Sequence, residues 1–144
     1  MRAYPHSVES ERALLGGLLQ DPALLTDIFD IVKPTDFYRP DHGALFELMG
    51  QMSASDEQID LVTLPQRLNR EGRAERYGGI PYVVELPGYC PSTANLTHYA
   101  MVIREQSVRR QLITTMENLR SEAFDGPAEL GQLLENAVKN IANL

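Results

Sequence analysis

Residues 96–124, LTHYAMVIREQSVRRQLITTMENLRSEAF, predict one long helix whose apolar side changes along its length. At about 100° of rotation per residue, the early apolar side chains share one arc, which comprises Leu96, Tyr99, Ala100 and Ile103. The later ones lie on the opposite side of the helix: Val108, Leu112, Met116, Leu119 and Ala123. Either the helix breaks around residues 104–107, or it continues and its two halves bury opposite faces. Both alternatives predict that the second half leaves the globular part of the protein.

A second helix completes this predicted appendage after a turn at residues 125–127. Pro127 is placed to start that helix, and apolar residues then recur at helical spacing up to Ile141. Two helices joined by a short turn form an antiparallel hairpin. The apolar stripe of the last helix spans ~140°, which is wider than one partner helix covers.

This surplus of apolar surface predicts an interface with another copy of the chain. Ile113 and Phe124 add to the surplus, because they lie off the main stripe. The economical solution is a four-helix bundle made by two hairpins, and the alternative is that the surplus folds back onto the rest of the chain. The predicted interface comprises Leu112, Ile113, Met116, Leu119, Phe124, Leu130, Leu133, Leu134, Ala137, Val138 and Ile141.

The preceding residues predict a compact, all-α globular head at 1–103, followed by the protruding hairpin at 104–144. Ser7 is a good cap for a helix reaching Leu19 or Gln20, with Glu9 and Glu11 in its first turn. Asp21 and Pro22 start a second helix, which is predicted to end at Lys33-Pro34.

Further signals divide the rest of the head into short helices. Pro40 opens a third helix before a polar loop at residues 53–58, and Thr63 with Gln66 fits a capping box. Residues 80–86 are predicted to be a short helix although Tyr82-Val83-Val84 favours a strand, and Asn95 is expected to cap the long helix.

The pair Gly16-Gly17 interrupts an apolar helix, where each glycine costs up to about 1 kcal/mol relative to alanine. Such a pair predicts that another element approaches the helix closely at this point.

Composition limits the possible functions. The chain has 144 residues and a net charge of −7, which disfavours binding of nucleic acid over the whole surface. It has no apolar run long enough to span a membrane and no signal-peptide core. The single cysteine, Cys90, excludes an internal disulfide and fits a reducing cytoplasm. The absence of a glycine-rich phosphate loop predicts no nucleotide cofactor in this chain.

Three sets of reactive or charged side chains suggest a chemical role, and each also has a simpler interpretation. The three histidines and many carboxylates suggest a metal-dependent hydrolase only weakly, because they are scattered over separate segments. Cys90 and His98 as nucleophile and base lack an orienting third group. The arginines between residues 67 and 76 fit either an acidic or phosphate partner or, more simply, a solvated face with local salt bridges.

A series of short sequence motifs between residues 5 and 113 matches the order of motifs in one known family. They run from PHSVESE (5–11) and LLG (14–16) through DFY (36–38), IDLVTL (59–64) and YGGIPY (77–82) to STAN (92–95) and HYA (98–100). This series resembles the N-terminal domain of the bacterial replicative hexameric DNA helicase, the DnaB type. Positions that carry the resemblance are Glu11, Asp36, Phe37, His42, Phe46, Asp60, Thr63, Gly78, Gly79, Asn95 and Tyr99.

The resemblance implies a collar domain without catalytic activity of its own. It implies hairpin-to-hairpin dimers, joined into a collar of six subunits that receives the primase and, in some systems, a helicase loader. ATP, magnesium and most DNA contact would belong to a C-terminal motor domain that this chain lacks. Arg104, Arg109 and Arg110 lie where the apolar stripe switches, and we expect them to cover the head–hairpin junction or to pair across a subunit contact.

Two other functions remain as alternatives at this stage. The helicase-binding C-terminal domain of a bacterial primase has a similar head and hairpin. A stand-alone helical metal-dependent hydrolase is the third possibility.

Overall fold

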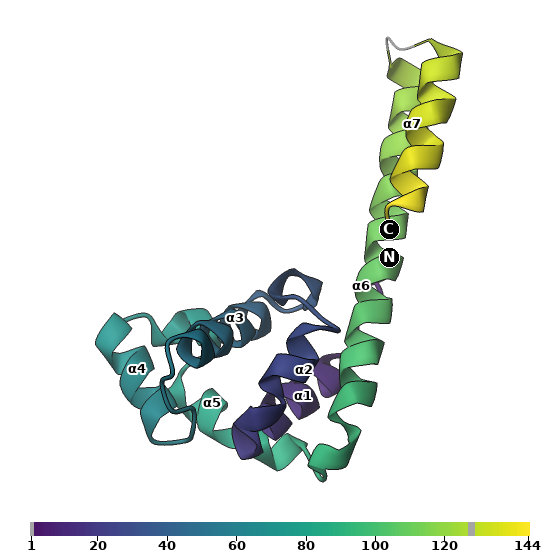
Figure 1. Cartoon of the computed structure of the whole chain (residues 1–144). Coiled ribbons are helices and arrows are strands. Elements are labelled where there is room, and N and C mark those ends of the chain that lie inside the picture. Colours follow the sequence, from purple (N-terminus) through teal and green to yellow (C-terminus); the bar gives the residue numbers. More distant parts are fainter. Residues whose placement is uncertain (1, 127–128) are drawn as a thin grey trace.

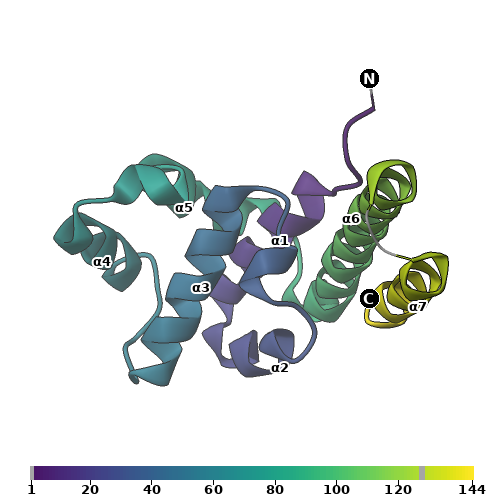
Figure 2. The same cartoon turned by 90° about the horizontal axis from the view of Figure 1, so that it is seen from above.

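The fold is all-α, as predicted, and its hairpin projects from the head. The computed structural model describes residues 2–126 and 129–144, and every regular element in these ranges is a helix. Figure 1 shows α6 (Leu96–Asp125) rising away from the head and α7 (Leu130–Ala142) returning along its outer part. Seen from above, α6 and α7 lie beside each other at one side of the head (Figure 2).

The head is built around α1 (Val8–Gln20), which lies in the middle of the core. It is packed by α3 (Pro40–Ala54), the first half of α6 and the 3-10 turns Pro22–Leu24 and Leu86–Tyr89. Helix α2 (Leu25–Phe29) follows the first of these turns and contacts α6. Helices α4 (Thr63–Glu71) and α5 (Ile80–Glu85) complete the far end of the head. Leu14, Leu15 and Leu18 are fully buried, as is Phe46 of α3. The helical spacing of these leucines therefore marks a true core face.

Helix α6 is continuous through residues 104–107, which confirms the continuous helix and excludes the break. The second half buries no face within the described part of this chain, since Leu112, Met116 and Ala123 of its predicted apolar side are exposed. The buried residues of α6 are Leu96, Ala100, Ile103 and Ser107, and beyond Ser107 no residue of α6 is buried. The division at residue 103 therefore falls inside one helix that the head and the hairpin share. The predicted turn at 125–127 begins at Gly126, whereas Pro127 lies outside the described residues.

Three predicted helix ends differ from the structure. The helix after Pro22 starts as a 3-10 turn, and α2 ends at Phe29 instead of Lys33, because residues 30–32 tighten into turns that place Val32 in the core. Asp21 makes no capping hydrogen bond with its side chain. Helix α3 continues through Ser53 to Ala54, where a loop was predicted.

At two predicted caps, the capping side chain belongs to a residue three positions upstream. Thr63 is inside α4, and the Asp60 carboxylate accepts the Val62 and Thr63 N–H groups at 2.8 and 2.7 Å. Asn95 occupies the N-cap position of α6, as predicted, but its side chain accepts no capping hydrogen bond. Ser92 caps the 3-10 turn that leads directly into α6.

The Gly16-Gly17 pair is explained by close approach. A Cβ atom at Gly16 would lie 2.0 Å from the Leu86 carbonyl oxygen, and one at Gly17 would lie 2.2 Å from Cδ2 of Leu96. The backbone after α5 and the start of α6 can pack on α1 only because these two side chains are absent.

We expect Gly16→Ala to lower the free energy of unfolding by about 1–3 kcal/mol or more, because the new methyl group meets backbone that cannot rotate away. Urea unfolding followed by circular dichroism measures this change. Gly131→Ala is the matched control: a Cβ there meets nothing within 4 Å, so the same substitution should be neutral or slightly stabilising. Equal stability of the two variants would contradict the close-approach explanation.

The Asp60 cap should make α4 sensitive to acid. Backbone N–H groups of Thr63 and Val62 bind the carboxylate and lower its pKa below the ordinary value of 3.8. The contribution of Asp60 is therefore fully present above the unfolded-state pKa and is lost as pH falls through the lower folded-state pKa. We expect Asp60→Asn to weaken the pH dependence of the melting temperature below pH 3.8, measured by thermal denaturation across that range. An unchanged acid profile would contradict this role.

Candidate subunit interface

The described part of the hairpin presents large apolar side chains to solvent. Phe124 is 74% exposed, and Leu130 and Val138 are each 70% exposed. No residue of α7 is buried, although the helix is strongly amphipathic. We call the exposed set the hairpin surface: Leu112, Met116, Phe124, Leu130, Leu134, Val138 and Ile141.

The apolar stripe of α7 divides into two parallel halves. Leu133 and Ala137 are partly buried, one turn apart, and mark the half that faces α6. Leu130, Leu134, Val138 and Ile141 form the exposed half. Of the other predicted interface residues, Ile113 and Leu119 are also partly buried. The hairpin thus covers part of its own apolar surface and leaves the rest available to another molecule.

Buried Asp36 fixes the base of the hairpin to the head. Its side chain is 3% exposed, and its Oδ1 atom accepts hydrogen bonds from the Ser107 hydroxyl at 2.7 Å and from Arg104 at 3.0 Å. The other oxygen accepts the Lys33 N–H at 2.8 Å. The Asp36 carboxylate therefore connects the turn before α3 to residues 104–107 of α6.

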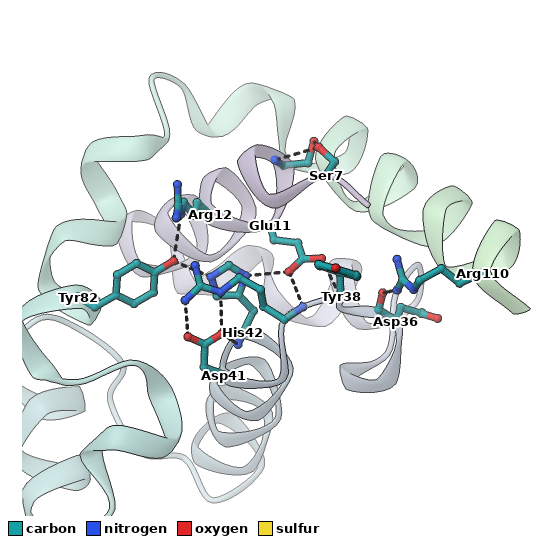
Figure 3. Close-up of polar contacts among 11 residues, drawn as sticks. Ser7, Glu11, Arg12, Asp36, Tyr38, Asp41, His42, Tyr82 and Arg110 are labelled. Carbon is teal, nitrogen blue, oxygen red and sulfur yellow. Dashed lines mark hydrogen bonds and ion pairs between the residues drawn. The ribbon is translucent and has the colours of Figure 1, made fainter. Parts of the chain in front are cut away.

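The three junction arginines have different environments. Arg110 donates to the backbone carbonyls of Asp36 at 2.6 Å and Pro5 at 2.8 Å, and its guanidinium lies over the Tyr38 ring (Figure 3). Arg104 binds Asp36, as described above. Arg109 is exposed, and its one ion pair with a described residue is with Glu105 on the same helix. The structure thus brings Arg104 and Arg110, but not Arg109, to the junction.

Behind the junction, Glu11 and His42 form a buried polar pair. Each side chain is at most 2% exposed, and His42 Nδ1 lies 2.7 Å from Glu11 Oε1. The Glu11 carboxylate also accepts the backbone N–H groups of Tyr38 at 2.7 Å and Arg39 at 3.3 Å. Figure 3 shows these bonds converging from α1 and α3. A buried carboxylate with several donors stays satisfied, so this cluster orders the chain between α2 and α3.

Tyr82 extends the cluster to the surface. Its hydroxyl lies 2.6 Å from His42 Nε2 and accepts a hydrogen bond from Arg12 Nε at 3.1 Å. Each nitrogen of the His42 ring therefore has a polar partner, the Glu11 carboxylate at Nδ1 and the Tyr82 hydroxyl at Nε2. Asp41 lies beside this cluster and accepts a hydrogen bond from Arg39. Burial alone would raise the pKa of the Asp41 carboxyl, but the Arg39 hydrogen bond and nearby positive charge hold this pKa below its usual value.

The remaining motif positions are spread over the head. Phe37 and Phe46 pack ring to ring with centroids 5.0 Å apart, whereas Asp60 and Thr63 lie at the start of α4. Gly78 and Gly79 adopt positive φ just before α5, and Asn95 and Tyr99 lie at the start of α6. The structure therefore brings Glu11, Asp36 and His42 together near one junction and leaves the others in separate structural roles.

Sequence reasoning missed Arg12, Tyr82 and Ser107. Ser107 had a usable signal, because it falls on the same helical arc as Leu96 and Ile103. A polar residue on an apolar arc indicates a buried hydrogen bond.

In the described residues, the three histidines and Cys90 lie in separate environments. His6 stacks on Tyr38, His42 belongs to the buried pair, and His98 is exposed. In residues 2–126 and 129–144, no group of three or more His, Cys, Asp or Glu side chains is placed to hold a metal ion. Cys90 is buried and donates to the Ser92 carbonyl, and burial raises the pKa of its thiol, which opposes a nucleophilic role.

Two further observations concern the surface. Arg67 forms ion pairs with Glu57 at 2.6 Å and Glu71 at 3.1 Å, which favours a solvated face for the central arginine run. Among the described helices, none combines the length and apolar character that crossing a membrane requires.

The head and the projecting hairpin define an all-helical domain with an exposed apolar surface on its hairpin. The chain belongs to the family of DnaB-like helicase N-terminal domains, whose model matches residues 3–105. This finding confirms the resemblance seen in the sequence and favours the helicase over the primase alternative.

Individual relatives extend the match through the hairpin. The chain is 36% identical over 140 residues to the replicative DNA helicase DnaB of Geobacillus stearothermophilus and 32% identical over 140 residues to the replicative DNA helicase DnaC of Bacillus subtilis. Each alignment covers 97% of this chain and 31% of the relative. The chain therefore spans less than a third of the length of these curated relatives.

Solved structures give the same fold. The crystal structure of the N-terminal domain of DnaB helicase from Mycobacterium tuberculosis has a TM-score of 0.89 at 27% identity, covering 99% of this chain and 100% of that one. A DnaB-like replicative helicase, described with its interactions with primase, has a TM-score of 0.75 at 18% identity. That alignment covers 95% of this chain and 31% of the helicase, and at this identity it shows the fold alone.

The Asp36 contacts generate a stability prediction. Asp36→Ala leaves the Ser107 hydroxyl, the Lys33 N–H and Arg104 without their acceptor, and should lower the free energy of unfolding by about 1–3 kcal/mol. Urea unfolding at a fixed protein concentration measures the change. The control is Arg109→Ala, which removes only an exposed pair on one helix and should cost less than about 0.5 kcal/mol. If Asp36→Ala is as mild as the control, Asp36 does not anchor the hairpin.

Proposed function

We propose that this chain is the collar domain of a replicative DNA helicase, which joins copies of the protein into a ring and docks the primase and a helicase loader. Oligomerisation uses the hairpin surface of one copy against that of another. The domain performs no reaction and binds no cofactor of its own. ATP, magnesium and most DNA contact belong to a motor domain outside this chain, and the assembly acts in the cytoplasm.

The exposed half of the α7 stripe carries this proposal. Four apolar side chains, Leu130, Leu134, Val138 and Ile141, follow one side of the helix, and all are at least 42% exposed. Leu112 and Met116 add 41% and 43% exposed side chains on α6. A two-helix hairpin cannot enclose such a surface by itself, whereas two hairpins together form a four-helix bundle. Burial of this surface against a second copy supplies the hydrophobic driving force for association.

The shape of the molecule supports the same arrangement. The hairpin projects from the head (Figure 1). The hairpin of a second copy can therefore lie against it without contacting the head of the first copy. Family membership and the replicative helicases among the relatives supply the biological setting of the ring. The likeness to a helicase studied with primase supports, at the level of fold, a docking role for the head or hairpin.

Introducing two negative charges on the exposed half of α7 tests the proposed interface between hairpins. We expect the chain to be a dimer or larger at micromolar concentration, and Leu134→Asp with Val138→Asp to make it monomeric, because unpaired carboxylates are costly to bury. Size exclusion with light scattering gives the mass. These positions are preferable to Leu133, which faces α6 and whose change would disrupt the hairpin itself.

The matched control adds the same charge at polar, exposed hairpin positions. Ser121→Asp with Asn140→Asp should assemble like the parent. Circular dichroism should show equal helix content in all three proteins. A double variant of Leu134 and Val138 that keeps the parent mass would refute the hairpin interface.

A further inference from the structure

Arg12 is a partly exposed cation that forms no ion pair with any described carboxylate. Its guanidinium carbon lies 5.9 Å from the centroid of the Tyr82 ring and 5.2 Å from that of Tyr89. Its only hydrogen bond to a described residue runs from Nε to the Tyr82 hydroxyl at 3.1 Å (Figure 3). Both terminal nitrogens of the guanidinium therefore remain available to a ligand.

This arginine is held in place before any ligand arrives. Tyr82, which accepts from Nε, is itself bound to His42 at 2.6 Å, and His42 is bound to buried Glu11. The chain of contacts connects the guanidinium to the core of the head. A flexible arginine loses side-chain entropy when it binds a partner, and this one has already lost much of it in the fold.

Arg39 shows what such an arginine binds. It lies over the same Tyr82 ring, with its guanidinium carbon 5.0 Å from the centroid. Arg39 donates from Nε to Asp41 Oδ1 at 3.0 Å and from a terminal nitrogen to the other carboxylate oxygen. An arginine stacked on a tyrosine thus receives a carboxylate in fork geometry. On Arg12, which shares the ring, no described residue supplies that carboxylate.

The surroundings favour a protein carboxylate over a nucleic-acid phosphate. Tyr89 beside the guanidinium is 42% exposed, and exposed tyrosine next to arginine is the usual composition of an interaction hot spot. Glu9, exposed and three residues before Arg12 on α1, shares its helical face, and the chain carries a net charge of −7. These charges repel every phosphate of a nucleic-acid backbone, whereas a single carboxylate brings only one negative charge and its apolar neighbours bring none.

We propose that Arg12 and Tyr89 form a recognition site for an aspartate or glutamate side chain, flanked by apolar residues, of a partner protein. Arg12 supplies the charge and the fork of donors, and Tyr89 supplies the apolar contact. The site lies on the head and uses no residue of the hairpin surface, so it does not depend on the proposed oligomerisation.

Peptide titration of the full, ¹⁵N-labelled chain tests the site. The probes are acetyl-Leu-Glu-Leu-amide and its glutamine analogue, and the signals are Arg12 Nε–H and the Tyr89 amide in NMR spectra. We expect saturable shifts with the glutamate peptide and at least tenfold weaker binding of the glutamine peptide. Arg12→Gln should abolish the difference, and Tyr89→Ala should weaken binding several-fold. Arg70→Gln, which removes an exposed arginine of α4 that forms no ion pair with a described residue, should bind like the parent.

Three results would overturn the proposal. They are equal binding of the two peptides, unchanged discrimination in Arg12→Gln, and displacement of the glutamate peptide by a single-stranded oligothymidylate at lower concentration, which would indicate a nucleic-acid site. Should Arg12→Gln fail to fold, Arg12→Lys decides: it keeps the charge but lacks the fork of donors, so discrimination must fall. Light scattering of the same samples gives the mass of the assembly. An unchanged mass would show that a change in peptide binding does not result from loss of the hairpin interface.

Discussion

One helix serves two different packing surfaces, and the rest of the structure depends on this constraint. The first half of α6 places Leu96, Ala100 and Ile103 in the core of the head, and its second half places Leu112 and Met116 in solvent. Because the helix is unbroken, the orientation of the head sets the orientation of the hairpin. The switch of apolar face between Ile103 and Val108 therefore marks, in the sequence, the point where α6 leaves the head and enters the hairpin.

Burial of charge at the base of this helix gives the junction its specificity. Asp36 and Glu11 are almost completely buried, yet each carboxylate receives several hydrogen bonds from separate elements. Such groups tolerate no shift of their partners, because an unsatisfied buried carboxylate is costly. An apolar contact of the same size would permit sliding between α6 and the head. The polar network instead selects one arrangement of α1, α3 and α6.

The architecture was predictable from the sequence because it depends on periodicity, which is local. The face switch, the hairpin and the core leucines of α1 all follow from residues three or four apart. Caps and helix ends were less predictable, since Asp60 replaces Thr63 and Ser92 replaces Asn95 through turns a few residues long. The polar network was hidden for a different reason: Glu11, His42 and Tyr82 come from three distant segments, and only the folded chain brings them into contact. Ser107, which donates to buried Asp36, did carry a local signal, because it lies on the apolar arc of α6.

The length of α6 beyond its anchor turns a small change at the base into a large one at the tip. From Ser107 to Asp125, a helix rises about 27 Å, at 1.5 Å per residue. A tilt of about 10° at the Asp36 contact would carry the tip sideways by about 5 Å, roughly one turn of helix. The few atoms around one carboxylate thus act as the pivot of a lever. A ligand that broke or altered the Asp36 contacts would therefore displace the far end of the hairpin, and with it any neighbour attached there.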